Sequence, residues 1–255
     1  MSEFITQYFE RIGLVYNRTE PRTAALLDKI QYAHVTHVPY ENIDILNGIP
    51  ISLDTDRLFE KIVLRGRGGY CFELNGLLGW LLRELGFEVK DCMARFLRAE
   101  TEIPMRRHRI LLVTTEDKKT FICDVGVGSV APRLPVPFVF GEVFEQFGEQ
   151  YRLRKDNFFG TVLEEFYKGA WRDVFGFTAE PQLDIDYVMP SFYCEKHPDS
   201  IFNKSFMVSL KTETSRVTMD NFTYKEFEGD RIALVEELDE ISAVARLKEK
   251  FGIIW

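Results

Sequence analysis

One cysteine stands in a sequence context that suits a reactive thiol. Three glycines and two arginines precede Cys71 in the stretch RGRGGYCFELN, residues 65–75, and an apolar helical run follows it. Free N–H groups and the dipole at a helix start favour a thiolate, and Arg65 and Arg67 lie close by in sequence. The glycines allow close approach of a ligand, and N–H groups in such a turn can stabilise an oxyanion. A buried structural cysteine is the competing interpretation.

A histidine and an aspartate lie in a segment that predicts a β-hairpin. In HRILLVTTEDKKTFICD, residues 108–124, two apolar runs flank a charged turn, so a hairpin centred near Glu116 is expected. His108 and Asp124 would then be directly opposed cross-strand partners, with Cβ atoms about 5 Å apart. A nucleophilic thiol needs a base and a group that orients the base, which this pair would supply. A strand-edge histidine and a turn aspartate are the alternatives.

The other cysteines and histidines give no disulfide or zinc pattern. The three further cysteines are widely spaced and form no CxxC pair: Cys92, Cys123 and Cys194. Neither a disulfide framework nor a zinc knuckle is predicted, and a metal site built from scattered ligands is the alternative. His34 and His37, spaced i, i+3 near a helix end, could be metal ligands, but packing or capping roles are favoured.

The elements that must position these residues change in type at Gly86. Before it, apolar spacing predicts helices over residues 3–12, from Thr19-Glu20-Pro21 to Pro39, over 54–63 and over 71–85. After it, strands are expected at 89–97, 108–115, 120–125, 151–155 and 162–166. A mixed segment at 184–194, strands at 206–211 and 215–219 and an amphipathic helix over 236–251 follow. The order is helices, then strands, then a small mixed unit.

Composition limits the class of protein. The chain has 255 residues, 45% of them apolar and 28% charged, which is ordinary for a globular protein with a substantial core. The net charge of −8 argues against a nucleic-acid partner, but not against a small anionic ligand held by local donors. The N-terminus has no signal-peptide pattern and no stretch reaches membrane-spanning length, so a cytoplasmic protein without a membrane partner is expected.

Taken together, these motifs resemble those of arylamine N-acetyltransferases. The resemblance rests on five segments that occur in the family's order: RGGYCFELN, HVPYENIDIL (37–46), HRILLV (108–113), DVGVG (124–128) and KHPDSIF (196–202). It covers most of the chain and is weakest after Phe206. It implies an α+β fold with a cysteine-protease-like catalytic core. The units would be a helical bundle (1–86) with the nucleophile, an antiparallel β-barrel-like domain (87–190) with the histidine and aspartate, and an α/β lid (191–255).

The resemblance also implies a reaction. Cys71, His108 and Asp124 would form a catalytic triad that moves an acetyl group from acetyl-CoA to an arylamine, hydrazine or arylhydroxylamine. An acetyl-cysteine would be the intermediate, and CoA would leave after the first half-reaction (ping-pong). Acetyl-CoA is thus expected as a co-substrate, with no permanently bound cofactor and no metal.

Further residues are placed by the same resemblance. Gly126 and Gly128 could allow close approach of CoA, although two turn glycines could equally be structural. The acceptor pocket should include Tyr40, Phe96, Val127 and Phe202. Tyr40 adds a hydroxyl and Val127 removes a ring relative to many bacterial relatives, which predicts a roomier, slightly more polar pocket. Glu41 is expected to support the cysteine loop by pairing with an approach arginine, Arg67.

Other readings of the same residues stay open. An amide synthase that closes a tethered amine onto an acyl chain would use the same triad with a different pocket and acyl carrier. A thiol hydrolase would use it and admit water. A non-catalytic protein that binds CoA or another ligand would tolerate loss of the Cys71 thiol.

Overall fold

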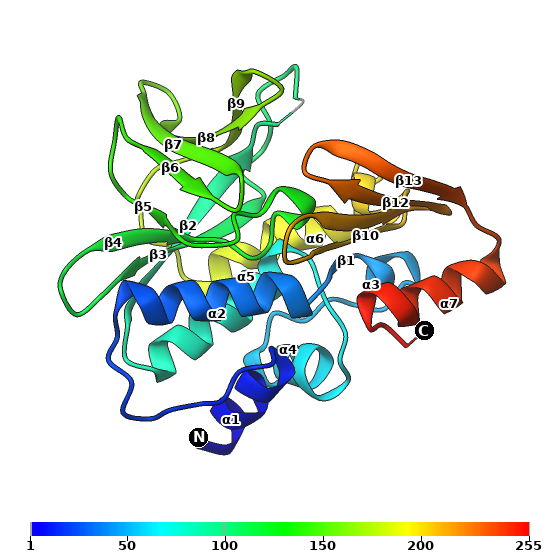
Figure 1. The fold of residues 1–255 in the computed structure, drawn as a ribbon, viewed down its shortest axis with the longest axis horizontal. Helices are drawn as coiled ribbons and strands as arrows, with labels where there is room; N and C mark the ends of the chain where they lie inside the picture. Colours follow the sequence, from blue (N-terminus) through cyan, green and yellow to red (C-terminus); the bar gives the residue numbers. More distant parts are fainter. Residues whose placement is uncertain (1, 99, 255) are drawn as a thin grey trace.

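The computed structural model describes residues 2–98 and 100–254, which form two antiparallel sheets and a set of helices (Figure 1). Most helices of the N-terminal part gather beneath the larger sheet. They are α1 (Ser2–Arg11), α2 (Ala24–His37), α3 (Ile43–Leu46), α4 (Thr55–Phe59) and α5 (Cys71–Glu84). A π-helical turn, Glu60–Leu64, continues α4.

The larger sheet has eight strands and resembles a barrel. Its strands, in spatial order, are β5 (Val136–Pro137), β4 (Thr120–Cys123), β3 (His108–Thr114), β2 (Glu88–Phe96), β9 (Ala170–Phe177), β8 (Gly160–Tyr167), β7 (Glu149–Asp156) and β6 (Val143–Gln146). Gln146 on edge strand β6 both donates to and accepts from the backbone of Leu134, just before the other edge strand. A side chain thus links the two edges, and the predicted antiparallel, barrel-like sheet is confirmed.

The smaller sheet brings together distant parts of the chain. Its order is β1 (Tyr40–Glu41), β10 (Met207–Lys211), β11 (Arg216–Asp220), β12 (Thr223–Glu228) and β13 (Arg231–Glu237). The last helix, α7 (Glu240–Phe251), contributes Leu247 and Phe251 to the core of this unit. Because β1 comes from the N-terminal part, the cysteine loop and the C-terminal sheet are joined directly. The division into units at residues 86 and 190 stays a prediction.

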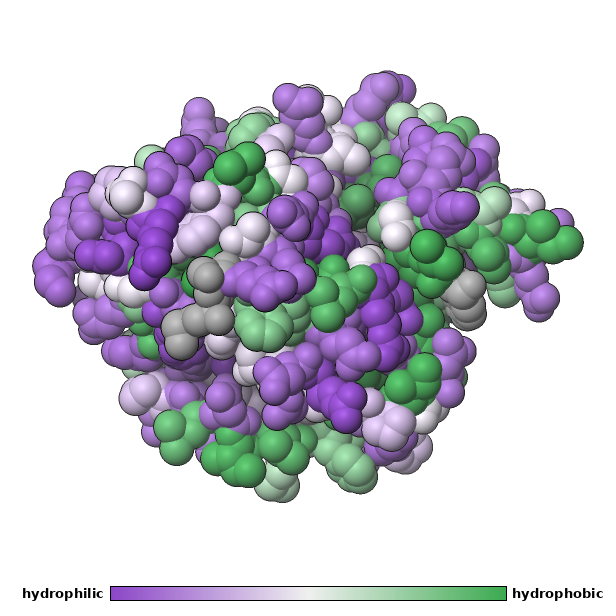
Figure 2. Space-filling model, turned by 90° about the horizontal axis from the view of Figure 1, so that it is seen from below, coloured by the Kyte–Doolittle hydropathy of each residue, from purple (hydrophilic) through white to green (hydrophobic). Residues whose placement is uncertain are grey.

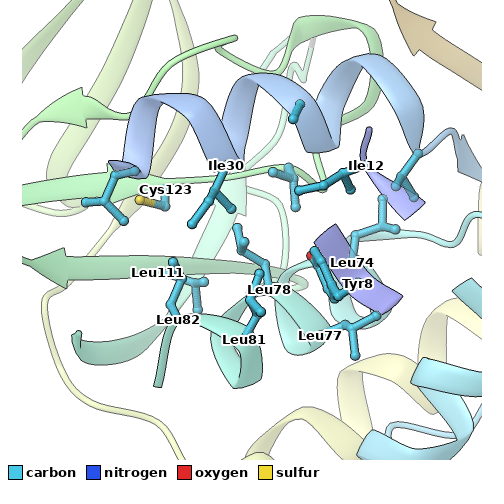
Figure 3. Close-up of a cluster of buried hydrophobic side chains, with 14 of the residues drawn as sticks. Tyr8, Ile12, Ile30, Leu74, Leu77, Leu78, Leu81, Leu82, Leu111 and Cys123 are labelled. Atoms are coloured by element: carbon cyan, nitrogen blue, oxygen red, sulfur yellow. The ribbon is translucent and has the colours of Figure 1, made fainter. Parts of the chain in front are cut away.

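Helix α5 is the centre of the first core because apolar side chains cover most of its circumference (Figure 3). Its leucines are buried between α1, α2 and strand β3: Leu74, Leu77, Leu78, Leu81 and Leu82. A fully buried leucine contributes about 1.5–3 kcal/mol to folding. Glu73 accepts a hydrogen bond from the Tyr70 N–H at 3.1 Å and so caps the first turn. The start of α5, where Cys71 lies, is therefore held firmly.

Three sequence predictions are wrong in detail. Helix α2 begins at Ala24, capped by Thr23, and not at Thr19-Glu20-Pro21. Helix α7 begins at Glu240, capped by Asp239, because residues 231–237 continue the sheet as β13. The sequence pattern does not predict strands β1, β5, β6, β9, β12 and β13. The segment predicted as mixed contains the helix α6 (Val188–Lys196).

The outer surface mixes hydrophilic and hydrophobic side chains. On the face in Figure 2 the hydrophobic residues form separated groups within a largely hydrophilic surface. Within the described part of the chain, every helix is too short or too polar to cross a membrane.

Candidate active site

Cys71 is the first residue of α5 and is buried, with its Sγ 3.7 Å from the carbonyl oxygen of Arg107. Two of the three glycines before it, Gly68 and Gly69, serve close packing. A Cβ on Gly68 would lie 1.9 Å from the carbonyl oxygen of Pro39, so only glycine fits there. The Glu41 N–H donates to the carbonyl oxygen of Gly69 at 2.9 Å. The loop before the thiol is thus fixed against the strand segment at 40–41.

The two approach arginines do not supply charge to the thiol. Arg67 pairs with Glu41 at 2.8 Å and with Asp44 at 3.0 Å, and Arg65 pairs with Glu60. Glu41 is fully buried, and the Arg67 pair ties its segment to the cysteine loop. The expectation that these arginines favour a thiolate is therefore wrong, since neighbouring carboxylates already neutralise them.

A hydrogen bond of 2.7 Å joins His108 Nε2 to Asp124 Oδ2, and both residues are buried. The other carboxylate oxygen accepts from Asn75 Nδ2 and from the Gly126 N–H, each at 2.8 Å. Both oxygens of Asp124 are thus engaged. Because Asp124 occupies Nε2, the remaining ring nitrogen of His108, Nδ1, is the one left for proton exchange.

The predicted register of this hairpin is wrong by two residues. The observed pairs are Leu111 with Cys123 and Thr114 with Thr120, so the turn centres on residue 117 and β4 ends before Asp124. Side chains alternate between faces with a period of two, so a shift of two residues keeps His108 and Asp124 on one face. They meet diagonally, and the expected contact forms in a different register.

Asn75 is a site residue that the sequence did not single out. It lies one turn after Cys71, fully buried in a mainly apolar helix. Its Nδ2 donates to Asp124 and to the carbonyl oxygen of Arg109, and its Oδ1 accepts from the Val125 N–H at 2.9 Å. It therefore connects the cysteine helix to the histidine strand and the aspartate turn. The sequence signal that could have identified it is a single amide side chain four residues after the cysteine.

One cavity of about 410 Å³ collects most of the predicted site residues. Cys71 and His108 line it, together with all four predicted acceptor residues and both glycines: Tyr40, Phe96, Val127, Phe202, Gly126 and Gly128. Asp124 lies behind His108, and Glu41 and Arg67 lie outside the lining. Residues not predicted from sequence also contribute, among them Arg98, Arg107, Ser129, Ile201, Met207 and Ser209. The cavity is the candidate active site.

The two glycines of the aspartate turn are required by packing. A Cβ on Gly126 would lie 2.6 Å from Cys71 Cα, closer than real Cβ contacts. Gly128 has φ +64°, in the left-handed region that favours glycine, and a Cβ there would be 3.2 Å from Ser209 Oγ. The sequence left open whether these glycines allow close approach of CoA or serve the fold. The structure shows close packing at both positions, and Gly126 sets the position of Cys71.

Burial raises the pKa of the Cys71 thiol well above its ordinary value, and the nearby Cys194 thiol adds to the rise. Backbone hydrogen bonds from Arg109 and Phe72 oppose it. The thiol alone is thus protonated at neutral pH, contrary to the expectation from the helix start. A nucleophilic thiolate needs a partner that takes the proton, and His108 lines the same cavity.

The histidine pair near the end of α2 is engaged in local contacts. His34 Nδ1 bonds to the Tyr8 hydroxyl at 2.7 Å, and burial lowers the pKa of His34 to about 3. His37 Nδ1 bonds to the carbonyl oxygen of Ala33 at 2.9 Å. Among residues 2–98 and 100–254, no three His, Cys, Asp or Glu side chains gather as metal ligands would.

Comparisons with known proteins agree with this arrangement. Residues 23–254 match a family model described as N-acetyltransferase. The arylamine N-acetyltransferase of Mycobacterium tuberculosis is 32% identical over 98% of this chain and 89% of its own length, and that of Escherichia coli K12 is 30% identical over 99% and 90%. The solved enzyme of Salmonella typhimurium superposes with a TM-score of 0.92 at 29% identity over 99% of this chain and 92% of that one. The structure of a Mycobacterium marinum arylamine N-acetyltransferase in complex with CoA superposes with a TM-score of 0.91, at 29% identity over 98% of this chain and 92% of that one.

Fold and site together define an acyltransferase of the N-acetyltransferase class. More narrowly, the chain belongs to the arylamine N-acetyltransferase family. The resemblance seen in the sequence motifs is confirmed.

Proposed function

We propose that this enzyme moves an acetyl group from acetyl-CoA to an arylamine, hydrazine or arylhydroxylamine through an acetyl-Cys71 intermediate. The observation that carries the proposal is the shared cavity of Cys71 and His108, with His108 held by Asp124 at 2.7 Å. Family membership and the CoA complex of the M. marinum relative support acetyl-CoA as the donor. The enzyme itself would retain no cofactor.

In the first half-reaction, His108 Nδ1 accepts the Cys71 proton as sulfur attacks the thioester carbonyl. Because burial disfavours an isolated thiolate, the thiolate forms together with the imidazolium. The Cys71 N–H and a second nearby donor hold the oxyanion. The carbon–sulfur bond to CoA breaks, and the His108 proton passes to the departing CoA thiolate.

In the second half-reaction, the acceptor nitrogen or oxygen attacks acetyl-Cys71 while His108 accepts its proton. The sulfur leaves and regains a proton from His108, which restores the resting enzyme. Asp124 stabilises the charged ring and keeps Nδ1 directed into the cavity. A cysteine at a helix start with a histidine on a neighbouring strand is the cysteine-protease-like core that we propose.

The experiment that tests this proposal is intact-protein mass spectrometry after treatment with acetyl-CoA alone. We expect one acetyl group on Cys71, lost on addition of an arylamine with formation of the acetylated amine. CoA release that needs no amine would favour the thiol hydrolase. A protein that binds acetyl-CoA and stays unmodified would favour a non-catalytic role, and transfer of longer tethered acyl chains alone would favour the amide synthase.

Substituting Val127 with phenylalanine should narrow the acceptor pocket. Val127, Tyr40 and Phe202 line the cavity beside Cys71, and a phenyl ring would fill space that valine leaves open. We expect kcat/KM for bulky bicyclic arylamines to fall about tenfold, while aniline changes less than threefold. Steady-state rates over acceptors of graded size test this, and an unchanged preference would contradict the roomier pocket.

Substituting Gly126 with alanine should damage catalysis by displacing the thiol. The added Cβ meets Cys71 Cα at 2.6 Å, and an ångström of misplacement costs about 100-fold in rate. We expect a loss of that size, measured as acetyl transfer, with the cooperative thermal transition retained. The control is Gly169→Ala, at a turn glycine with φ +86° and open space around its Cβ position. The left-handed backbone costs alanine about 1–2 kcal/mol of stability there, but no contact displaces the thiol, so the folded variant should transfer at the wild-type rate. Equal transfer rates in the two variants would contradict the inference that a Cβ at Gly126 displaces the thiol.

A further inference from the structure

A second cavity, of about 240 Å³, lies among helices α1, α4 and α5, of which α1 and α4 are at the bottom of the view in Figure 1. We call it the aromatic cavity. None of the described residues that line it also lines the active-site cavity. Its two lining residues on α5 follow Cys71 by 9 and 13 positions, which is about 14–20 Å along the helix axis. The lining consists of three aromatic rings, two carboxylates and one hydroxyl: Phe4, Phe59, Trp80, Asp56, Glu84 and Thr55.

The three rings of the aromatic cavity meet nearly at right angles. The planes of Phe4 and Phe59 are inclined by 88°, with ring centroids 4.8 Å apart, and those of Phe59 and Trp80 by 75° at 5.9 Å. Phe59 is buried, Trp80 is half-buried and Phe4 is exposed, so the rings run from the core to the surface. An aromatic ring carries negative charge on its face, so rings that enclose one space from different directions attract a cation.

The two carboxylates of the aromatic cavity are uncompensated. In the described part of the chain, neither the Asp56 nor the Glu84 carboxylate forms an ion pair or a hydrogen bond. The arginines next to them in sequence, Arg57 and Arg83, pair with other carboxylates, and the described lining contains no basic side chain. Two negative charges therefore lie beside the rings without a counter-ion.

The end of α5 adds to this negative potential. Glu84 is the last residue of the helix. The aligned peptide dipoles of a helix place about half a negative charge at its C-terminus, where cations are stabilised. The helix end, the carboxylates and the ring faces thus favour a positively charged ligand at the same place.

Of the possible cations, a quaternary ammonium ion fits this combination. Magnesium and calcium need several oxygen ligands, and among residues 2–98 and 100–254 no three His, Cys, Asp or Glu side chains gather as metal ligands would. A primary ammonium is compact and strongly hydrated, so it loses water at a high cost. Methyl groups on the nitrogen replace that hydration and can pack against aromatic rings, while the positive charge remains.

We propose that the aromatic cavity binds a small, free quaternary ammonium compound of the choline type. Its ammonium group lies among the rings of Phe4, Phe59 and Trp80, and Asp56 and Glu84 balance its charge. This site is separate from Cys71, so the inference does not depend on the proposed acetyl transfer.

The test follows the indole N–H signals of the full-length, ¹⁵N-labelled enzyme by NMR during titration with choline chloride, with sodium chloride at equal ionic strength as the reference. The chain has three tryptophans, and the Trp80 signal is assigned by its loss in Trp80→Phe. We expect a saturable shift of this signal with a Kd of about 1–10 mM. The signal of Trp171 should stay in place, because Arg152 already lies over its ring, 4.2 Å from the centroid.

Two variants test the two kinds of contact. Glu84→Gln removes one charge at nearly constant size and should weaken choline binding about tenfold. Phe4→Leu removes one ring and should weaken it about threefold. The matched control is Glu10→Gln, an exposed glutamate of α1 outside the cavity, which should bind choline as the wild type does.

Two further compounds separate charge from shape. 3,3-Dimethylbutan-1-ol has the shape of choline without its charge and should leave the Trp80 signal in place. Phosphocholine, which stands for a lipid headgroup, carries a phosphate that both carboxylates repel and should bind at least about tenfold more weakly than choline. A Trp80 signal that choline does not move, an equal response to the neutral alcohol, or wild-type affinity in both Glu84→Gln and Phe4→Leu would overturn the site. Equal affinity for phosphocholine would contradict a site for the free compound.

Discussion

Replacing Cys71 with serine is expected to lower acetyl transfer by at least about 10⁴-fold, because loss of a nucleophile removes the covalent route altogether. A serine hydroxyl is far less acidic than a thiol, and burial disfavours its anion as it disfavours that of the thiol. Serine differs by one atom and keeps a small polar group at the start of α5, so the fold should persist. The measurements are CoA release with an arylamine and intact mass after exposure to acetyl-CoA.

Cys194 provides the matched control. It is another buried free cysteine, in the same apolar cluster as Cys71, and belongs to α6. Cys194→Ala should keep transfer within about threefold of wild type and still accept one acetyl group. An acetyl group found on Cys194, or a Cys71→Ser enzyme that keeps a tenth of the rate, would defeat the assignment of the nucleophile.

The sequence identified the reacting residues because each lies in a short, self-contained pattern. Cys71 follows a glycine loop and begins an apolar helix, and His108 and Asp124 stand at the outer ends of two apolar runs. Their contact could be expected even in a wrong register, since strand faces alternate with a period of two. What the sequence could not supply is which groups from other elements meet them. Asn75 shows this, because its three hydrogen bonds reach segments 34 to 50 residues away.

Burial and ion pairs with residues distant in sequence also determine the charge around the Cys71 thiol. Arg67 is close to the thiol in sequence, but Glu41 and Asp44 hold it from a different part of the chain.

The fold, too, depends on contacts that the local sequence pattern does not reveal. Strand β13 is largely exposed on both faces, so it lacks the alternation that marks a half-buried strand. At the start of α2, the Thr19-Glu20-Pro21 pattern predicts a helix start, but the cap is Thr23, whose side chain accepts from the Leu26 N–H.

Substituting Asp124 with asparagine is expected to lower kcat by about 10²–10⁴-fold while leaving the fold intact. Asn75 Nδ2 and the Gly126 N–H both donate to Oδ1, so the carbonyl oxygen of the new amide must take that position. Its NH₂ group then faces His108 Nε2 in place of Oδ2. An NH₂ group donates, so Nε2 must be unprotonated and the ring proton moves to Nδ1. A protonated Nδ1 cannot accept the Cys71 proton.

This role is one of positioning, and a readout other than turnover can isolate it. Alkylation of Cys71 by iodoacetamide needs the thiolate, which forms only if His108 takes the proton, so Asp124→Asn should slow alkylation at pH 7 about 100-fold or more. The matched control is Asp117→Asn, an aspartate in the turn of the same hairpin with a side chain 51% exposed, which should alkylate and transfer at wild-type rates. If Asp124→Asn alkylates normally and loses turnover, the carboxylate acts after thiolate formation. If Asp124→Asn keeps more than a tenth of the wild-type rates of alkylation and of acetyl transfer, the hydrogen bond from His108 to Asp124 supports the fold. It then does not set the tautomer on which the proposed chemistry depends.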